Sequence, residues 1–201
     1  MLRTNFDFTL AKGDFCFVVG ESGSWKTSLM KLITRQIMPP PRTVHVYGDD
    51  VSYLHEDAVQ DMRRHIGVVY QDYKLLSDRS VLENIILPLQ IQDAAENHAK
   101  ERAETLLQEF GFRHELNIKV SLLSGWEKQK VAIMRALSTS PELIIADEPT
   151  GNLDQKASRT IADMLIHANK QWHTILFITH DVTLIQYVQS IYPQVRVVNI
   201  E

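Results

Sequence analysis

Short apolar runs alternate along this chain with longer segments in which hydrophobic residues have a helical spacing. The runs predict strands at residues 15–19, 44–47, 66–70, 143–146, 174–178 and 195–198. Val and Ile are frequent in these runs and helical segments separate them, a pattern typical of βαβ units around a mainly parallel sheet. We therefore expect an α/β fold, with a helix at residues 28–37 after the first strand.

The middle of the chain has a different pattern. Between residues 73 and 137 the hydrophobic spacing is helical, with amphipathic segments at 99–110 and 124–137. We expect one domain over residues 1–201, in which 1–72 and 138–201 form the α/β core and 73–137 form an inserted helical subdomain.

A phosphate-loop pattern with one departure follows the first predicted strand. In the intact pattern, GxxxxGK[ST], backbone N–H groups surround phosphates, the lysine reaches the terminal phosphates and the hydroxyl meets Mg²⁺. Lys26 and Thr27 fill the last two positions, but Trp25 stands where the pattern has glycine, which lets the backbone approach phosphate closely. The predicted nucleotide-binding loop comprises Gly20, Glu21, Ser22, Gly23, Ser24, Trp25, Lys26, Thr27 and Ser28.

Polar residues end three of the other predicted strands. Asp147 and Glu148 follow an apolar run, His180 follows the next one, and Gln71 follows the run at 66–70. Ligands of α/β sheets bind at the carboxyl ends of the strands, so these side chains are expected beside the loop. There Asp147 can hold Mg²⁺ and Glu148 can polarise an attacking water. Solvated carboxylates are the alternative, which the nearby Lys26 and Thr27 disfavour.

The composition adds limits to this picture. The net charge is −4, without a run of Lys and Arg that could follow a phosphate backbone, so nucleic acid is not an expected partner. No apolar stretch approaches the ~18 residues of a membrane span, so membrane association is expected only through a partner. Cys16 is the single cysteine, which excludes an intrachain disulfide and suggests a buried small hydrophobe in a reducing cytoplasm.

Together these motifs carry a family resemblance that spans nearly the whole chain. The phosphate loop, Gln71, LSGWEKQ at 123–129, DEPTGNLD at 147–154 and His180 occur in the order found in ABC-transporter ATPases. The LSGGxQ signature, here with Trp126 at its second glycine, is specific to that superfamily. Residues 147–154 resemble the group of cell-division, lipoprotein-release and macrolide-export ATPases, and residues 71–84 resemble the cell-division ATPase FtsE most closely.

The resemblance implies a phosphate-loop fold of the ABC type and an ATPase that acts as a homodimer. Each ATP would lie between one subunit's phosphate loop and its partner's Ser124, Gly125 and Trp126, with Asp154 at the interface. Thr27, Asp147 and Gln71 would organise Mg²⁺, Glu148 would be the general base, and His180 would sense the γ-phosphate. An integral membrane subunit, FtsX in the cell-division group, would meet the region after Gln71 and hold the protein on the inner face of the plasma membrane.

Two features depart from the family pattern. The chain begins close to the first strand and lacks most of the amino-terminal β-region with its adenine-stacking aromatic residue, so we expect a truncation or a misplaced start and assign no base-stacking residue. The second departure is that Trp25 and Trp126 both stand at glycine positions of motifs that contact the nucleotide.

Three hypotheses account for the tryptophans. In the first hypothesis the chain is a non-hydrolysing adaptor, although the remaining catalytic residues argue against decay. In the second, the phosphate loop is functional and tolerates the indole, which the bulk of that side chain disfavours. The third hypothesis is that a codon read as tryptophan, such as UGA, is glycine in the source organism. Trp172 also falls near a turn where relatives commonly carry glycine. With glycine at ~7% of positions, three such coincidences would arise in roughly 3 of 10,000 cases.

Overall fold

The fold is built on a five-stranded parallel sheet. The computed structural model describes residues 7–20, 26–112 and 116–200. The strand order is β4-β5-β6-β1-β7, and every pairing in this sheet is parallel. The strands are β1 (Phe15–Val19), β4 (Ile66–Val69), β5 (Leu143–Asp147), β6 (Thr174–Thr179) and β7 (Arg196–Asn199). The predicted α/β class with a mainly parallel sheet is confirmed.

The predicted strand at 44–47 is wrong as a member of this sheet. Only His45–Val46 (β2) is extended, and it pairs antiparallel with Asp49–Asp50 (β3) in a separate two-stranded sheet. Between them, Tyr47 and Gly48 have φ values of 55° and 93°. Positive φ at both central residues is the geometry of a tight hairpin turn, which ends the strand after two residues.

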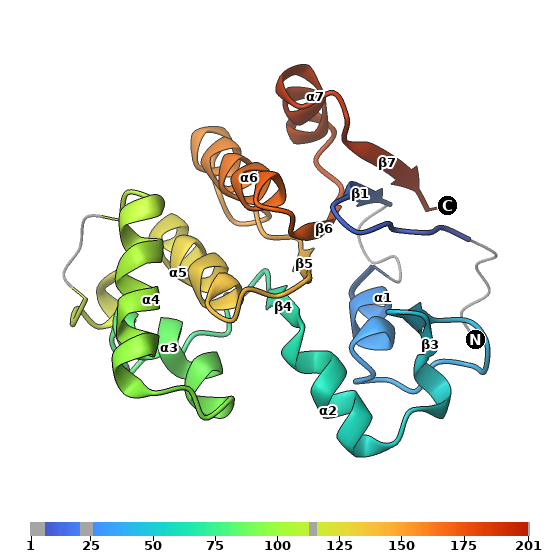
Figure 1. The fold of residues 1–201 in the computed structure, drawn as a ribbon. Helices are drawn as coiled ribbons and strands as arrows, with labels where there is room; N and C mark the ends of the chain where they lie inside the picture. The colour runs from blue at the N-terminus through green and yellow to red at the C-terminus, as the bar shows by residue number, and fades with distance from the viewer. Residues whose placement is uncertain (1–6, 21–25, 113–115, 201) are drawn as a thin grey trace.

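Seven α-helices and two short 3₁₀ turns (Val51–Tyr53 and Val120–Leu122) occur within the described residues. The helix predicted at 28–37 begins earlier, at Lys26, and ends earlier, at Ile33. It does not continue to residue 37 because Arg35 has a left-handed backbone with φ of 52°. Figure 1 shows α3, α4 and α5 grouped to one side of the sheet. The α-helices are α1 (Lys26–Ile33), α2 (Glu56–Arg64), α3 (Val81–Ile91), α4 (Glu96–Glu109), α5 (Gly125–Leu137), α6 (Gln155–Lys170) and α7 (Val182–Ile191).

Alternation along the strands gives the sheet two buried faces. In β6, Ile175 and Phe177 belong to the cluster that includes residues of α3 to α7, whereas Leu176 and Ile178 belong to the cluster with α1 and α2. This is the period of two expected of a strand whose neighbours on both faces are helices. Phe177 packs on Phe17 of β1 with 4.8 Å between ring centroids. Each such buried side chain contributes roughly 1.5–3 kcal/mol, so the two faces hold the layers together.

Cys16 lies in this core, as predicted. Its side chain is fully buried in β1, and burial raises the pKa of the thiol to about 11. The thiol is therefore protonated at neutral pH and serves as a small packing group.

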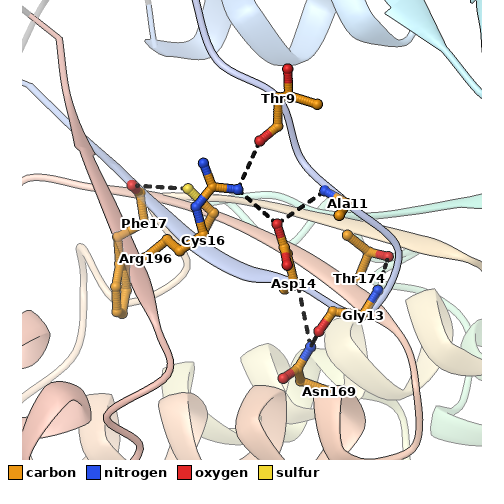
Figure 2. Close-up of polar contacts among 9 residues, drawn as sticks. All are labelled: Thr9, Ala11, Gly13, Asp14, Cys16, Phe17, Asn169, Thr174 and Arg196. Atoms are coloured by element: carbon orange, nitrogen blue, oxygen red, sulfur yellow. Dashed lines mark hydrogen bonds and ion pairs between the residues drawn. The ribbon is translucent and has the colours of Figure 1, made fainter.

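A buried asparagine joins the elements at the amino-terminal edge of the sheet. The Nδ2 amide of Asn169, near the end of α6, donates to the carbonyl oxygens of Gly13 (2.9 Å) and His173 (2.8 Å). Its Oδ1 accepts the hydroxyl of Tyr192 at 2.7 Å. Figure 2 shows this amide facing the turn before β1, beside the contacts that Asp14 makes. One side chain thus connects the starts of β1 and β6 to the end of α7.

We predict that Asn169→Asp destabilises the fold by ~3 kcal/mol or more, because a charged carboxylate oxygen would face carbonyl oxygens where the amide now donates. Urea unfolding followed by circular dichroism measures this loss. The matched control is Asn152→Asp at an exposed position, which should stay within ~0.5 kcal/mol of the parent. Equal unfolding free energies for the two variants would contradict the role assigned to Asn169.

Candidate functional site

The predicted site residues that follow strands lie at one edge of the sheet. Because β1, β4, β5 and β6 run parallel, their carboxyl ends face the same way. Gly20 follows β1, Gln71 follows the end of β4, and Glu148 and His180 directly follow β5 and β6. The tertiary structure therefore gathers residues that lie more than a hundred positions apart in the sequence. The edge on which they meet is the one at which open α/β sheets bind ligands.

Glu148 and His180 form a hydrogen-bonded pair at this edge. The imidazole Nδ1 of His180 lies 2.8 Å from Oε1 of Glu148, and the histidine side chain is 53% exposed while the glutamate side chain is only 12% exposed. The backbone of Glu148 is left-handed, with φ of 46°. A non-glycine residue in that region is held there by its surroundings, and such strain is concentrated at functional sites.

Thr179 fixes the second oxygen of the same carboxylate. Its hydroxyl donates to Oε2 of Glu148 at 3.3 Å and accepts the backbone N–H of Asp181 at 3.1 Å. Thr179 is fully buried as the last residue of β6. Sequence reasoning missed this residue, although a hydroxyl closing an apolar strand next to His180 was a usable signal. Both carboxylate oxygens are therefore oriented by neighbouring side chains.

Gln71 lies against the segment that follows Glu148. An added Cβ on Gly151 would come within 2.9 Å of the Gln71 Nε2 atom and 3.5 Å of the Glu148 carbonyl oxygen. The Gln71 side-chain amide thus fits against residue 151 only because that residue is glycine and has no side chain. The glutamine that follows β4 therefore lies beside the backbone of residues 148–151, which follow β5.

The structure describes two parts of the predicted phosphate loop, Gly20 after β1 and the start of α1. Glu21, Ser22, Gly23, Ser24 and Trp25 lie outside the described residues. The helix begins at Lys26, with Thr27 exposed and Ser28 half-buried in its first turn. Its first backbone N–H groups have no partner within the helix, and the helix dipole makes this end favourable for an anion.

Oxygen donors suited to a divalent cation occur at the same edge. Thr27 offers a hydroxyl, Asp147 a buried carboxylate at the end of β5, and Gln71 an amide oxygen. Hard oxygen ligands of this kind fit Mg²⁺, which binds with one or two carboxylates and takes its other ligands from phosphate and water. Among residues 7–20, 26–112 and 116–200, no group of three or more His, Cys, Asp or Glu side chains is placed to hold a metal ion.

The signature residues lie at the start of α5, within the helical group. Ser124 precedes the helix, and its backbone N–H donates to Oε2 of Glu127 at 2.8 Å in a capping box. Gly125 and Trp126 are exposed. Figure 1 shows α5 in the helical group to one side of the sheet.

Asp154 has a structural contact of its own. It precedes α6, and its Oδ1 accepts the backbone N–H of Ala157 at 2.8 Å, which caps the helix. The residue is exposed.

No helix in the described parts of the chain is both long enough and apolar enough to cross a membrane.

Comparison with known proteins agrees with the motifs. Residues 3–151 match the family described as ABC transporter. The cell-division ATP-binding protein FtsE of Haemophilus influenzae is 39% identical over 180 residues, covering 90% of this chain and 83% of FtsE. The lipoprotein-releasing system ATP-binding protein LolD of Hydrogenovibrio crunogenus is 38% identical over 180 residues, covering 89% of this chain and 78% of LolD. The macrolide export protein MacB 1 of Aeromonas hydrophila is 37% identical, but the match covers 92% of this chain and only 29% of MacB.

Solved structures give the same family. The ATP-binding cassette MJ0796, in a dimeric post-hydrolysis state bound to ADP and Pi, has a TM-score of 0.81 and 28% identity, covering 96% of this chain and 84% of that one. A second dimeric structure of MJ0796, described as a bacterial ABC transporter cassette, has a TM-score of 0.83 and 29% identity, covering 96% and 83%. The chain therefore belongs to the ABC transporter family, as an ATPase domain of the ABC type.

Proposed function

We propose that this chain binds and hydrolyses ATP as the nucleotide-binding subunit of an FtsE-like membrane complex. The observation that carries the proposal is the oriented pair of Glu148 and His180 at the carboxyl edge of the sheet, 2.8 Å apart. Glu148 accepts the proton of a water as that water attacks the γ-phosphorus, and the bond to the β-phosphate oxygen breaks to give ADP and phosphate. His180 holds the carboxylate and contacts the γ-phosphate.

The remaining polar groups bind the nucleotide and its cation. Lys26, Ser28 and the loop amides hold phosphate, as their motif suggests. Thr27, Asp147 and Gln71 would hold Mg²⁺, which neutralises charge on the phosphate oxygens when bound. Gln71 also lies beside the segment after Glu148, where its amide can orient the water.

We propose a homodimer with two composite sites. Ser124, Gly125 and position 126 of one subunit complete the site formed by the other's phosphate loop, and the α5 helix N-terminus adds favourable dipole charge. Asp154 lies at the interface. The dimers of MJ0796 support this arrangement.

The membrane partner is proposed to be an FtsX-like permease that contacts the region after Gln71. The protein would then sit on the inner face of the plasma membrane, in the cytoplasm, without a nucleic-acid partner. Within this scheme residues 73–137 form the helical subdomain, and 1–72 with 138–201 form the core. The identity to FtsE, 39%, favours this partner, while LolD at 38% and MacB 1 at 37% make a lipoprotein-release or macrolide-export complex the alternative.

A nucleotide-insensitive adaptor is the second candidate function. The observation that favours it is the presence of tryptophan at positions 25 and 126, where close approach to phosphate calls for glycine. For a protein with both tryptophans, ATP binding is expected to be severely weakened.

We predict that a variant carrying Trp25→Gly and Trp126→Gly binds and hydrolyses ATP, and that adding Glu148→Gln lowers kcat by about 100-fold or more while ATP still binds. Phosphate release and isothermal titration with ATP and Mg²⁺ measure the two properties. Hydrolysis that survives Glu148→Gln unchanged would remove Glu148 from its role. Absence of binding in the glycine variant would favour the adaptor, and co-purification with an FtsX-type or another permease would decide the partner.

A further inference from the structure

Trp172 occupies a backbone position that is built for glycine. It follows the end of α6 and has a left-handed backbone with φ of 73°. Its N–H donates to the Asn169 carbonyl oxygen at 2.9 Å, and the N–H of His173 donates to the Ala168 carbonyl oxygen at 3.4 Å. These two bonds define the Schellman motif, whose left-handed residue is usually glycine.

The tryptophan side chain gains little that could offset this backbone. A Cβ in the left-handed region crowds the following carbonyl oxygen, which is why glycine is favoured there. The Trp172 side chain is 78% exposed, with one ring edge facing Gly13, where an added Cβ would lie 3.7 Å from Cε3 of Trp172. Packing therefore gives no reason for an indole at this position.

The other two tryptophans stand at glycine positions of sequence motifs. Trp126 is 42% exposed at the second residue of α5, where the signature pattern has glycine. Trp25 replaces the glycine before the phosphate-loop lysine. The chain also has only 8 glycines among 201 residues, fewer than the ~7% typical of proteins. All three tryptophans of the chain thus stand where glycine is expected.

We propose that positions 25, 126 and 172 are glycine in the protein made by its source organism, encoded by UGA, a codon that some bacteria read as glycine. This inference gains independent support from the backbone at position 172, which has no part in the proposed ATP chemistry. It also explains how the catalytic residues persist beside two apparently disabled motifs.

The decisive experiment is mass spectrometry of the protein purified from its source, with sequencing of its gene. Glycine at all three positions and UGA at the three codons are expected. Tryptophan at any one of the three positions, or a UGG codon there, overturns the proposal, whatever the protein's ATPase activity proves to be.

A recombinant protein tests the backbone argument separately. Trp172→Gly should raise the folding equilibrium constant about 5- to 30-fold, measured by urea unfolding. Trp172→Ala is the matched control, because it removes the ring but keeps Cβ and should gain clearly less. Equal stability of the two variants would show that position 172 has no need for glycine.

A second inference comes from the turn that follows Gln71. Tyr73 and Lys74 are consecutive residues with left-handed backbones, at φ of 64° and 48°. Two successive non-glycine residues in this region store strain that other contacts must offset. The contacts come from α5: the guanidinium of Arg135 donates from Nη2 to the Tyr73 carbonyl oxygen at 2.8 Å and from Nη1 to that of Lys74 at 2.6 Å.

Arg135 is well suited to hold this turn. Its planar fork presents two N–H groups to two adjacent acceptors, which a lysine could not match. Burial lowers the pKa of the guanidinium, yet an arginine remains charged at any physiological pH. The turn also meets the other end of the same helix, since a Cβ added to Gly125 would lie 3.0 Å from the Tyr73 hydroxyl oxygen.

We infer that Arg135 is a positioning residue that clamps the strained turn and so holds Gln71 beside Gly151 and Glu148. Arg135 belongs to α5, the helix that begins with the signature residues. A movement of α5 would therefore also move the Gln71 amide at the catalytic edge. The inference rests on the role proposed above for Gln71.

The test uses the protein with Trp25→Gly and Trp126→Gly. Arg135→Gln should lower kcat about tenfold or more at unchanged ATP affinity, because a small misplacement of a site residue is costly. Adding Lys74→Gly, which removes one left-handed penalty, should restore most of the rate. Arg102→Gln is the matched control: Arg102 binds the carbonyl oxygens of Leu137 and Ser138 at the end of α5 and leaves the turn untouched.

Hydrogen exchange separates this inference from the proposed function. Arg135→Gln should speed exchange of the amides of residues 73–76, whether or not the protein hydrolyses ATP, and unchanged exchange overturns the clamp. Loss of ATP affinity together with kcat, with no rescue by Lys74→Gly, would mean that Arg135 is merely structural and would overturn the inference as well.

Discussion

The fixed alignment of the parallel strands at their amino-terminal edge is the constraint on which the rest of the structure depends. Asn169 joins the turn before β1, the start of β6 and the end of α7 through buried hydrogen bonds. Gly13 adds a bond from its N–H to the hydroxyl of Thr174 at 3.0 Å. Because strands of nearly equal length start in register here, they also end in register at the opposite edge. The site residues are gathered at that edge as a consequence.

Left-handed backbone occurs at two places in the candidate site. Glu148 leaves β5 with φ of 46°, which turns its carboxylate toward Thr179 and His180. Tyr73 and Lys74 have the same handedness after Gln71, and Arg135 holds them. Such conformations persist only where several contacts determine them together. At the candidate site they occur at Glu148 and just after Gln71, and at position 172 the same handedness favours glycine.

Family and subfamily rest on different kinds of evidence. The family follows from motifs spread over the chain and from a fold shared with ATP-binding cassettes at TM-scores of 0.81 and 0.83. The particular membrane complex depends on surface residues that contact a permease, and three relatives with different tasks lie within two percentage points of identity, at 39, 38 and 37%. The family is therefore shown by the fold and the motifs along the whole chain, whereas the three relatives do not decide the task of the complex.

The sequence by itself determined the parallel α/β fold, the strands of its sheet and the residues at the strand ends, because periodicity and motif spacing are local properties of the chain. It could not place the strand at 44–47, since the turn at Tyr47 and Gly48 separates it from the sheet. The contacts of Thr179, Arg135 and Asn169 could not be predicted either. Each acts on residues distant in sequence, at Glu148, at Tyr73 and at Gly13, and only tertiary packing brings such partners within hydrogen-bond distance.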